Sequence, residues 1–121
     1  MVTILVKSEN KENAIVQEPH EAGFIYLKEG RKVHKVMLGD IMYLESMKEY
    51  VQVHLIDSTL KLKTRLSDLE TRLPERDFIR IHKSYLISIS KIKQFDANTV
   101  HVGLTQLPIS RSYKQVFANR I

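Results

Sequence analysis

The chain has 121 residues, a formal net charge of +5 at pH 7 and no cysteine. Its length suits one domain that can bury a core, and the absence of cysteine excludes a disulfide framework and a thiolate metal site. The longest apolar runs have four or five residues, far short of the roughly 20 that span a membrane. No signal-peptide pattern precedes them, so we expect a cytoplasmic protein.

The positive charge is concentrated in the C-terminal third. Residues 78–121 carry a net charge of +6, with Asp96 as their one acid, whereas residues 1–77 carry a net charge of −1. A local excess of this kind favours a surface that meets DNA or RNA over a diffuse solubility charge.

The first 23 residues are expected to form an N-terminal extension or linker, and residues 24–121 the folded domain. Residues 2–6 are an apolar run suited to an edge strand. Residues 7–23 are polar and contain Pro19 and Gly23, which is typical of a linker. The alternative is that this segment is the remnant of an upstream one.

The pattern from residue 24 to residue 64 is that of β-strands. Two segments flank the turn Glu29-Gly30 and predict a hairpin. Further along, Val51, Val53 and Leu55 alternate with polar side chains, as in a strand with one buried face. The expected strands cover residues 24–28, 32–37, 41–45, 50–56 and 60–64.

One short helix is predicted next, over residues 66–74. Leu66, Leu69 and Leu73 share one face of it. Ser67, with Glu70 three residues later, has the spacing of a capping box, and Pro74 ends the helix.

The C-terminal third returns to strands. Residues 78–88 predict a strand, a loop and a second strand, and residues 96–98 predict a turn. We expect Val100, Val102 and Leu104 to share a buried face. The other expected elements are strands at 91–95, 100–104 and 106–109 and a final helix at 110–119 that begins at Ser110, with Tyr113, Val116 and Phe117 on its apolar side. The predicted fold is mostly β, with small antiparallel sheets and one or two short α-helices.

No catalytic or metal-binding pattern is present. The five histidines lack the spacing of a metal pair, and no serine lies in a GxSxG setting. Four glycines cannot supply a phosphate-binding loop of a known type. We therefore expect no enzyme activity, no metal and no cofactor.

The segment FIRIHKSYLIS, residues 78–88, carries the strongest functional signal. It interleaves Arg80, His82, Lys83 and Tyr85 among apolar residues. Arg111 lies where a later strand is expected to end, and Lys114 follows it. Cations held in loops on a rigid β framework suit contact with a polyanion. The alternative for each cation alone is an ordinary solvated face. By composition alone, residues 45–50 are a connecting loop.

These segments together resemble the LytTR family of DNA-binding domains from bacterial transcriptional regulators. The resemblance extends over residues 24–117 and rests on the order and spacing of several motifs. They are GDIMYLES at 39–46, KEYV at 48–51, the helix at 66–74, FIRIHKSYLIS at 78–88 and LPISRSY at 107–113.

The resemblance implies a fold and a mode of binding. Family members bind double-stranded DNA through loops between strands, which approach successive grooves. It implies base contacts at Lys48–Tyr50, Lys83 and Arg111. It also implies that the remaining side chains contact phosphates or support the loops; these are Arg80, His82, Tyr85 and Lys114. The partners it implies are a direct-repeat operator bound by two copies, RNA polymerase, and an upstream receiver domain or a membrane-bound regulator.

Two features depart from the family pattern. Ser88 stands where the family usually has Asn, and the 23 residues before the domain contain no phosphorylation pocket. We therefore expect either a stand-alone regulator or a fragment of a longer one. The rival hypotheses are a protein-interaction module of the same fold, an RNA-binding β domain with a row of exposed aromatic rings, and, more distantly, an enzyme.

Overall fold

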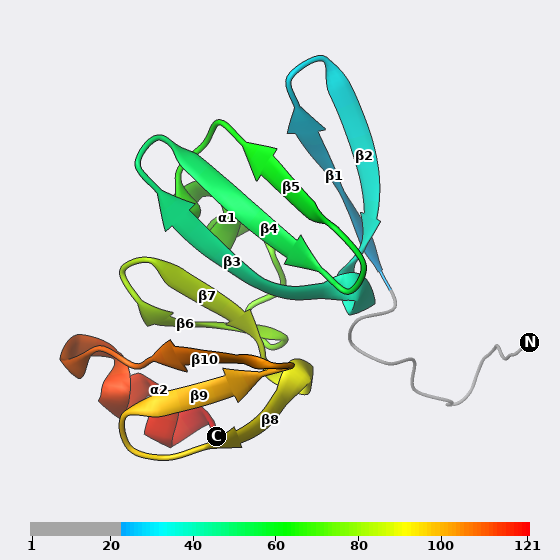
Figure 1. Cartoon of the computed structure of the whole chain (residues 1–121). Coiled ribbons are helices and arrows are strands. Elements are labelled where there is room, and N and C mark those ends of the chain that lie inside the picture. Colours follow the sequence, from blue (N-terminus) through cyan, green and yellow to red (C-terminus); the bar gives the residue numbers. More distant parts are fainter. Residues whose placement is uncertain (1–22) are drawn as a thin grey trace, which may run out of the picture.

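The computed structural model describes residues 23–121. The expected strand at 2–6 and all of the expected linker except Gly23 lie outside this range. The described residues form three antiparallel sheets and two short helices (Figure 1), which confirms the predicted fold class. The strands are β1 (Phe24–Glu29), β2 (Lys32–Met37), β3 (Ile41–Met47), β4 (Tyr50–Leu55), β5 (Thr59–Leu62), β6 (Phe78–His82), β7 (Tyr85–Ser88), β8 (Ile92–Phe95), β9 (Thr99–Val102) and β10 (Thr105–Pro108). The helices are α1 (Leu66–Arg72) and α2 (Lys114–Arg120).

The largest sheet has five strands in the order β5-β4-β3-β7-β6. Strand β3 lies at its centre because it pairs with its hairpin partner β4 on one side and with the later strand β7 on the other. Strands β10, β9 and β8 form a second sheet, and β1 with β2 forms the third. Figure 1 shows the hairpin β1–β2 beside the five-stranded sheet and the three-stranded sheet below it.

The hairpin β6–β7 lies between two hydrophobic cores. Leu86 faces the first core, with the leucines of α1, while the next residue, Ile87, faces the second, with Val100 and Phe117. This alternation follows from the two-residue period of a strand. Because β7 packs against both cores, the loop between β6 and β7 is held by contacts with each of them.

Helix α1 does not begin as the sequence predicted. Arg65 occupies the N-cap position, and no side chain there forms a capping hydrogen bond. Ser67 lies inside the helix, so the predicted capping box is wrong. The start of α1 is set by packing, because Leu66 and Leu69 are buried in the first core. This agrees with the rule that a two-turn helix depends on tertiary contacts.

The end of β9 also differs from the prediction. Val100 and Val102 are buried, but the strand stops there and Gly103 turns with φ +61°. Leu104 is 99% exposed, so the predicted shared face with the valines is wrong. The positive φ favours glycine at this turn, and a Cβ on Gly103 would in addition lie 2.9 Å from Cε, the end of the flexible Met42 side chain.

The final helix is shorter than predicted. A 3₁₀ turn, Arg111–Tyr113, precedes α2, and Ser110 forms no capping hydrogen bond. Phe117 is buried in the second core, whereas Val116 is exposed. No helix within residues 23–121 is long and apolar enough to cross a membrane.

Candidate nucleic-acid interface

Three connections lie next to one another at one edge of the molecule. They are the β3–β4 turn with Lys48, the β6–β7 turn with Lys83, and the connection from β10 to α2 with Arg111. Backbone hydrogen bonds join the segments that carry them: the Ser46 amide donates to the Ser84 carbonyl at 2.8 Å, and the Ser110 amide donates to the Ile81 carbonyl at 2.9 Å. Figure 1 shows all three along its left edge. The fold therefore brings together three cations that are far apart in the sequence.

The β3–β4 turn has an unusual backbone. Lys48 is exposed and has φ +58°. A positive φ at this position is what the two-residue hairpin turns of types I′ and II′ require of their first central residue. Tyr50 follows at the start of β4, and the Lys61 ammonium of β5 lies 4.5 Å from the centre of its ring. Lys61 was not among the predicted site residues. The signal in the sequence that could have identified Lys61 is its position between the buried Leu60 and Leu62, which places it on the exposed face of β5.

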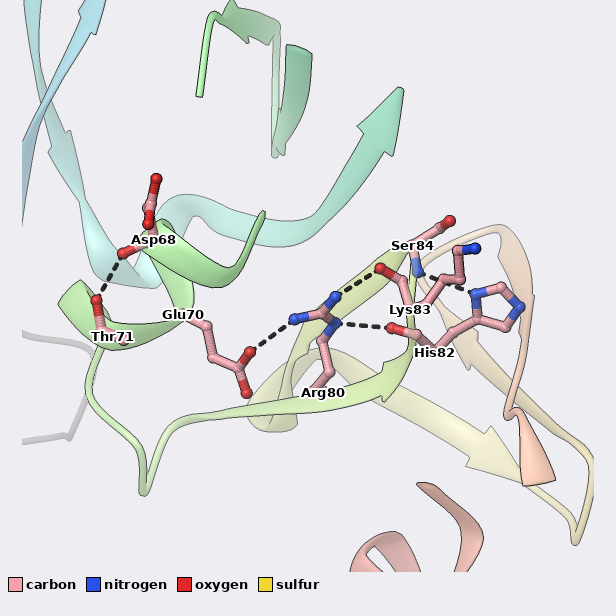
Figure 2. Close-up of polar contacts among 7 residues, drawn as sticks. All are labelled: Asp68, Glu70, Thr71, Arg80, His82, Lys83 and Ser84. Carbon is pink, nitrogen blue, oxygen red and sulfur yellow. Dashed lines mark hydrogen bonds and ion pairs between the residues drawn. The ribbon is translucent and has the colours of Figure 1, made fainter. Parts of the chain in front are cut away.

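The β6–β7 turn is held by Arg80. Its Nε donates to the His82 carbonyl at 2.7 Å, one Nη donates to the Lys83 carbonyl, and the other forms a 2.7 Å ion pair with Glu70 of α1. Figure 2 shows this guanidinium between the helix and the turn. The side chain is only 14% exposed, whereas Lys83 is exposed. This geometry matches loop support better than a phosphate contact.

His82 is fixed in one tautomer when neutral. Its Nδ1 accepts a hydrogen bond from the Ser84 amide at 3.0 Å, so the proton of the neutral ring must be on Nε2. In Figure 2 the second ring nitrogen points away from the turn. His82 therefore presents a donor at the edge where the three connections meet.

Tyr85 lies farther back, in a group of aromatic rings. Its ring centre is 5.3 Å from that of His82 and 6.4 Å from that of Tyr43, which stacks on His54 at 4.2 Å. Burial, and next the charge of Glu45, raise the pKa of the Tyr85 phenol. The phenol thus stays neutral at physiological pH. The rings contact each other, and those of Tyr43 and Tyr85 also pack against the second core, unlike an open stacking platform.

Arg111 and Lys114 differ in their surroundings. Arg111 is exposed at the start of the 3₁₀ turn. Lys114, at the start of α2, donates to the side-chain oxygen of Asn98 at 2.6 Å. Asn98 belongs to the predicted turn at 96–98, where Asp96 Oδ1 accepts from the Asn98 and Thr99 amides, both at 2.8 Å. Lys114 therefore also ties α2 to the β8–β9 turn.

The site has the chemistry of a polyanion contact. Lys48, Lys83 and Arg111 are exposed on the three connections, and the exposed acid Glu49 lies next to Lys48 in the β3–β4 turn. Within residues 23–121 no group of three or more His, Asp or Glu side chains is placed to hold a metal ion.

Known proteins match the chain in sequence and in fold. The family model described as LytTr DNA-binding domain matches residues 31–121. The transcriptional regulatory protein NatR of Bacillus subtilis (strain 168) is 32% identical over 79 residues, which are 65% of this chain and 34% of that protein. The sensory transduction protein LytT of the same organism is 28% identical over 93 residues, which are 72% of this chain and 39% of that protein.

A solved structure matches most of the domain. It is described as the LytTr DNA-binding domain of a methyl-accepting/DNA response regulator from Bacillus cereus. It has a TM-score of 0.70 at 25% identity and covers 81% of this chain and 95% of that one. The chain thus spans well under half of the curated relatives but nearly all of this solved domain.

Proposed function

The chain is a DNA-binding domain of the LytTR family, and we propose that it regulates transcription by recognising one sequence of double-stranded DNA. The observation that carries the proposal is the edge where Lys48, Lys83 and Arg111 project from three adjacent connections. A rigid sheet that presents cations from loops can insert them into a groove without a recognition helix.

We assign different tasks to the side chains of this edge. Lys83 and Arg111 are the base-reading groups, because both are exposed and both residue types reach guanine O6 and N7 in the major groove. Lys48 and Tyr50 contact base edges, or lie beside them, in the adjacent groove. Lys114 and His82 donate to phosphate oxygens, which adds affinity without sequence information.

The remaining residues support this surface. Arg80 and Tyr85 act from inside the fold, by holding the β6–β7 turn and by packing behind it. Lys61 joins the interface through its position over Tyr50. Each exposed cation that meets a phosphate releases a counterion, so we expect affinity to fall steeply with salt concentration.

We further propose how the domain works in the cell. Two copies bind a direct repeat on one face of the duplex and thereby recruit or block RNA polymerase in the cytoplasm. The relatives named as a transcriptional regulator and a sensory transduction protein are much longer than this chain. Control by a receiver domain or by a membrane-bound regulator is consistent with that.

Selection from a random duplex library with the purified 121-residue chain tests the proposal. Enrichment of a direct repeat with a spacing of about one helical turn, roughly 10 base pairs, is the expected result. Retention of DNA without an enriched sequence would contradict sequence-specific recognition. Failure to retain DNA at all would favour a protein-interaction module of the same fold.

A further inference from the structure

The hairpin β1–β2 has an apolar outer face. In its register Phe24 opposes Met37, Tyr26 opposes Lys35, and Lys28 opposes Val33. Directly opposed residues lie on the same side of an antiparallel pair. On the other side of the hairpin, Leu27 and Val36 are buried in the first core. Four large apolar side chains therefore share the outward side, each 41% to 63% exposed: Phe24, Tyr26, Val33 and Met37.

This face is ordered and positively charged. The Phe24 and Tyr26 rings meet edge to face with centres 5.4 Å apart, and the Lys35 ammonium lies 4.4 Å from the Phe24 ring centre. Lys28 shares the face, and Arg31 is exposed in the turn at its tip. Lys32 is exposed as well, but it lies on the other side of the hairpin, opposite Glu29. The net charge of residues 24–37 is +3. Acidic residues elsewhere offset this positive charge, so residues 1–77 as a whole carry a net charge of −1.

The one acid of the hairpin does not neutralise this face. Glu29 accepts a hydrogen bond from the Lys61 amide at 2.8 Å and pairs with His34 at 3.1 Å. His34 is opposite Leu27 in the register, on the inward side. The Glu29 carboxylate thus attaches the hairpin to β5, and it lies on the side of the hairpin opposite Lys28 and Lys35.

The hairpin lies away from the proposed DNA contacts. In Figure 1 it is on the right of the molecule, and the three connections with Lys48, Lys83 and Arg111 are on the left. A duplex held at those connections leaves the outer face of the hairpin accessible. Phosphates alone would also satisfy only the lysines and leave the four apolar side chains in water.

We propose that the outer face of the β1–β2 hairpin docks an acidic segment of a partner protein that also carries apolar side chains. Aromatic rings of this size are the side chains that most often dominate protein interfaces. Lysines around them match a negatively charged partner and guide its approach. This surface is separate from the DNA interface, so one domain can hold an operator and a partner protein together.

The test uses the whole chain and a labelled 12-residue synthetic peptide that alternates Glu with Phe and Leu. Fluorescence anisotropy measures its binding, and a second peptide with Lys in place of Glu is the charge control. We expect saturable binding of the acidic peptide only. Tyr26→Ser, and the pair Lys28→Glu with Lys35→Glu, should each weaken it about tenfold or more.

Matched variants separate this face from the rest of the surface. Leu104→Ser removes an exposed apolar side chain and Lys93→Glu reverses an exposed lysine, both outside the hairpin. Neither should change peptide binding, and the hairpin variants should keep the wild-type DNA affinity.

Several outcomes would overturn the proposal. They are no binding of the acidic peptide, binding of the Lys peptide with the same affinity, or a loss of peptide affinity in Leu104→Ser and Lys93→Glu as large as in the hairpin variants. Loss of duplex binding in the double lysine variant would show that the face belongs to the DNA interface. Self-association of the chain in sedimentation experiments that Tyr26→Ser abolishes would identify the occupant as a second copy.

Discussion

Arg80 of β6 and Glu70 of α1 form an ion pair 2.7 Å long, and the same guanidinium donates to the carbonyls of His82 and Lys83. One side chain thus connects a helix to the turn that presents Lys83. Exposed ion pairs contribute little to stability. This guanidinium is mostly buried and forms three hydrogen bonds, so its main effect is to fix the position of the turn.

Replacement of Arg80 by Lys should reduce the affinity for DNA by more, in free energy, than it reduces the free energy of unfolding. An ammonium cannot reach both carbonyls and Glu70 with the fixed geometry of a guanidinium. We expect a loss of affinity of about tenfold, since a misplaced contact group costs binding even when its charge remains. Arg72→Lys is the matched control, because Arg72 also donates to a carbonyl, that of Tyr26. Equal affinities of the two variants, measured by fluorescence anisotropy on the selected operator, would contradict the positioning role.

Two substitutions of His82 should separate its two ring nitrogens. His82→Asn places an acceptor near the Nδ1 position, where it can bond the amide two residues on, but removes the Nε2 donor. His82→Gln places an amide donor near Nε2 and loses the Nδ1 acceptor. If Nε2 contacts a phosphate, Asn lowers affinity for operator and random DNA alike while the Ser84 amide stays protected from hydrogen exchange. A variant His82→Asn with full affinity would exclude the phosphate contact.

Arg111 and Lys114 should affect binding in different ways. Arg111→Ala is expected to reduce discrimination between operator and random duplex, by about 1–3 kcal/mol for a lost bidentate base contact. Lys114→Ala should weaken both complexes about equally and make the salt dependence shallower by roughly one counterion. The measurement is a salt titration of both duplexes with each variant. Unchanged sequence preference in Arg111→Ala would refute its base-reading role.

Removal of the Ile87 side chain should destabilise the domain strongly. Ile87 is fully buried in the second core, and truncation of such a side chain to Ala leaves a cavity that costs about 2–5 kcal/mol. Leu104→Ala is the control, since this side chain is 99% exposed and its loss should change stability by no more than about 0.5 kcal/mol. Urea unfolding of both variants provides the comparison, and similar midpoints would be inconsistent with this core.

Asp96 should make stability depend on pH in the acid range. Hydrogen bonds from the Asn98 amide and then the Thr99 amide lower the pKa of its carboxyl group below the ordinary value of 3.8. A lowered folded-state pKa stabilises the fold above the unfolded-state value, and this contribution is lost as pH falls through the folded-state pKa. Asp96→Asn keeps an acceptor oxygen without the charge. The stability difference between wild type and Asp96→Asn should therefore be constant above pH about 4 and shrink below it. A stability difference that does not change with pH would contradict a lowered pKa of the Asp96 carboxyl group in the folded state.

The sequence by itself determined most of the β-strands and the residues of the three connections. Alternation with a two-residue period identified the strand around Val51 and Val53 because that period reflects which face is buried. The turn residues at 96–98 and Glu29-Gly30 likewise stand where local backbone chemistry favours a turn. These signals depend only on residues that are neighbours along the chain, so they can be recognised from the sequence alone.

Only the tertiary structure decided how these pieces meet. The insertion of β7 next to β3 is a pairing between distant segments, and it alone brings Lys48 and Lys83 to the same edge. Packing against the first core, and not a capping residue, set the start of α1 at Leu66. The burial of Arg80, the exposure of Leu104 and the apolar outer face of the hairpin depend on which neighbours cover each side chain. A pattern along the chain cannot specify those neighbours, because long-range contacts determine them.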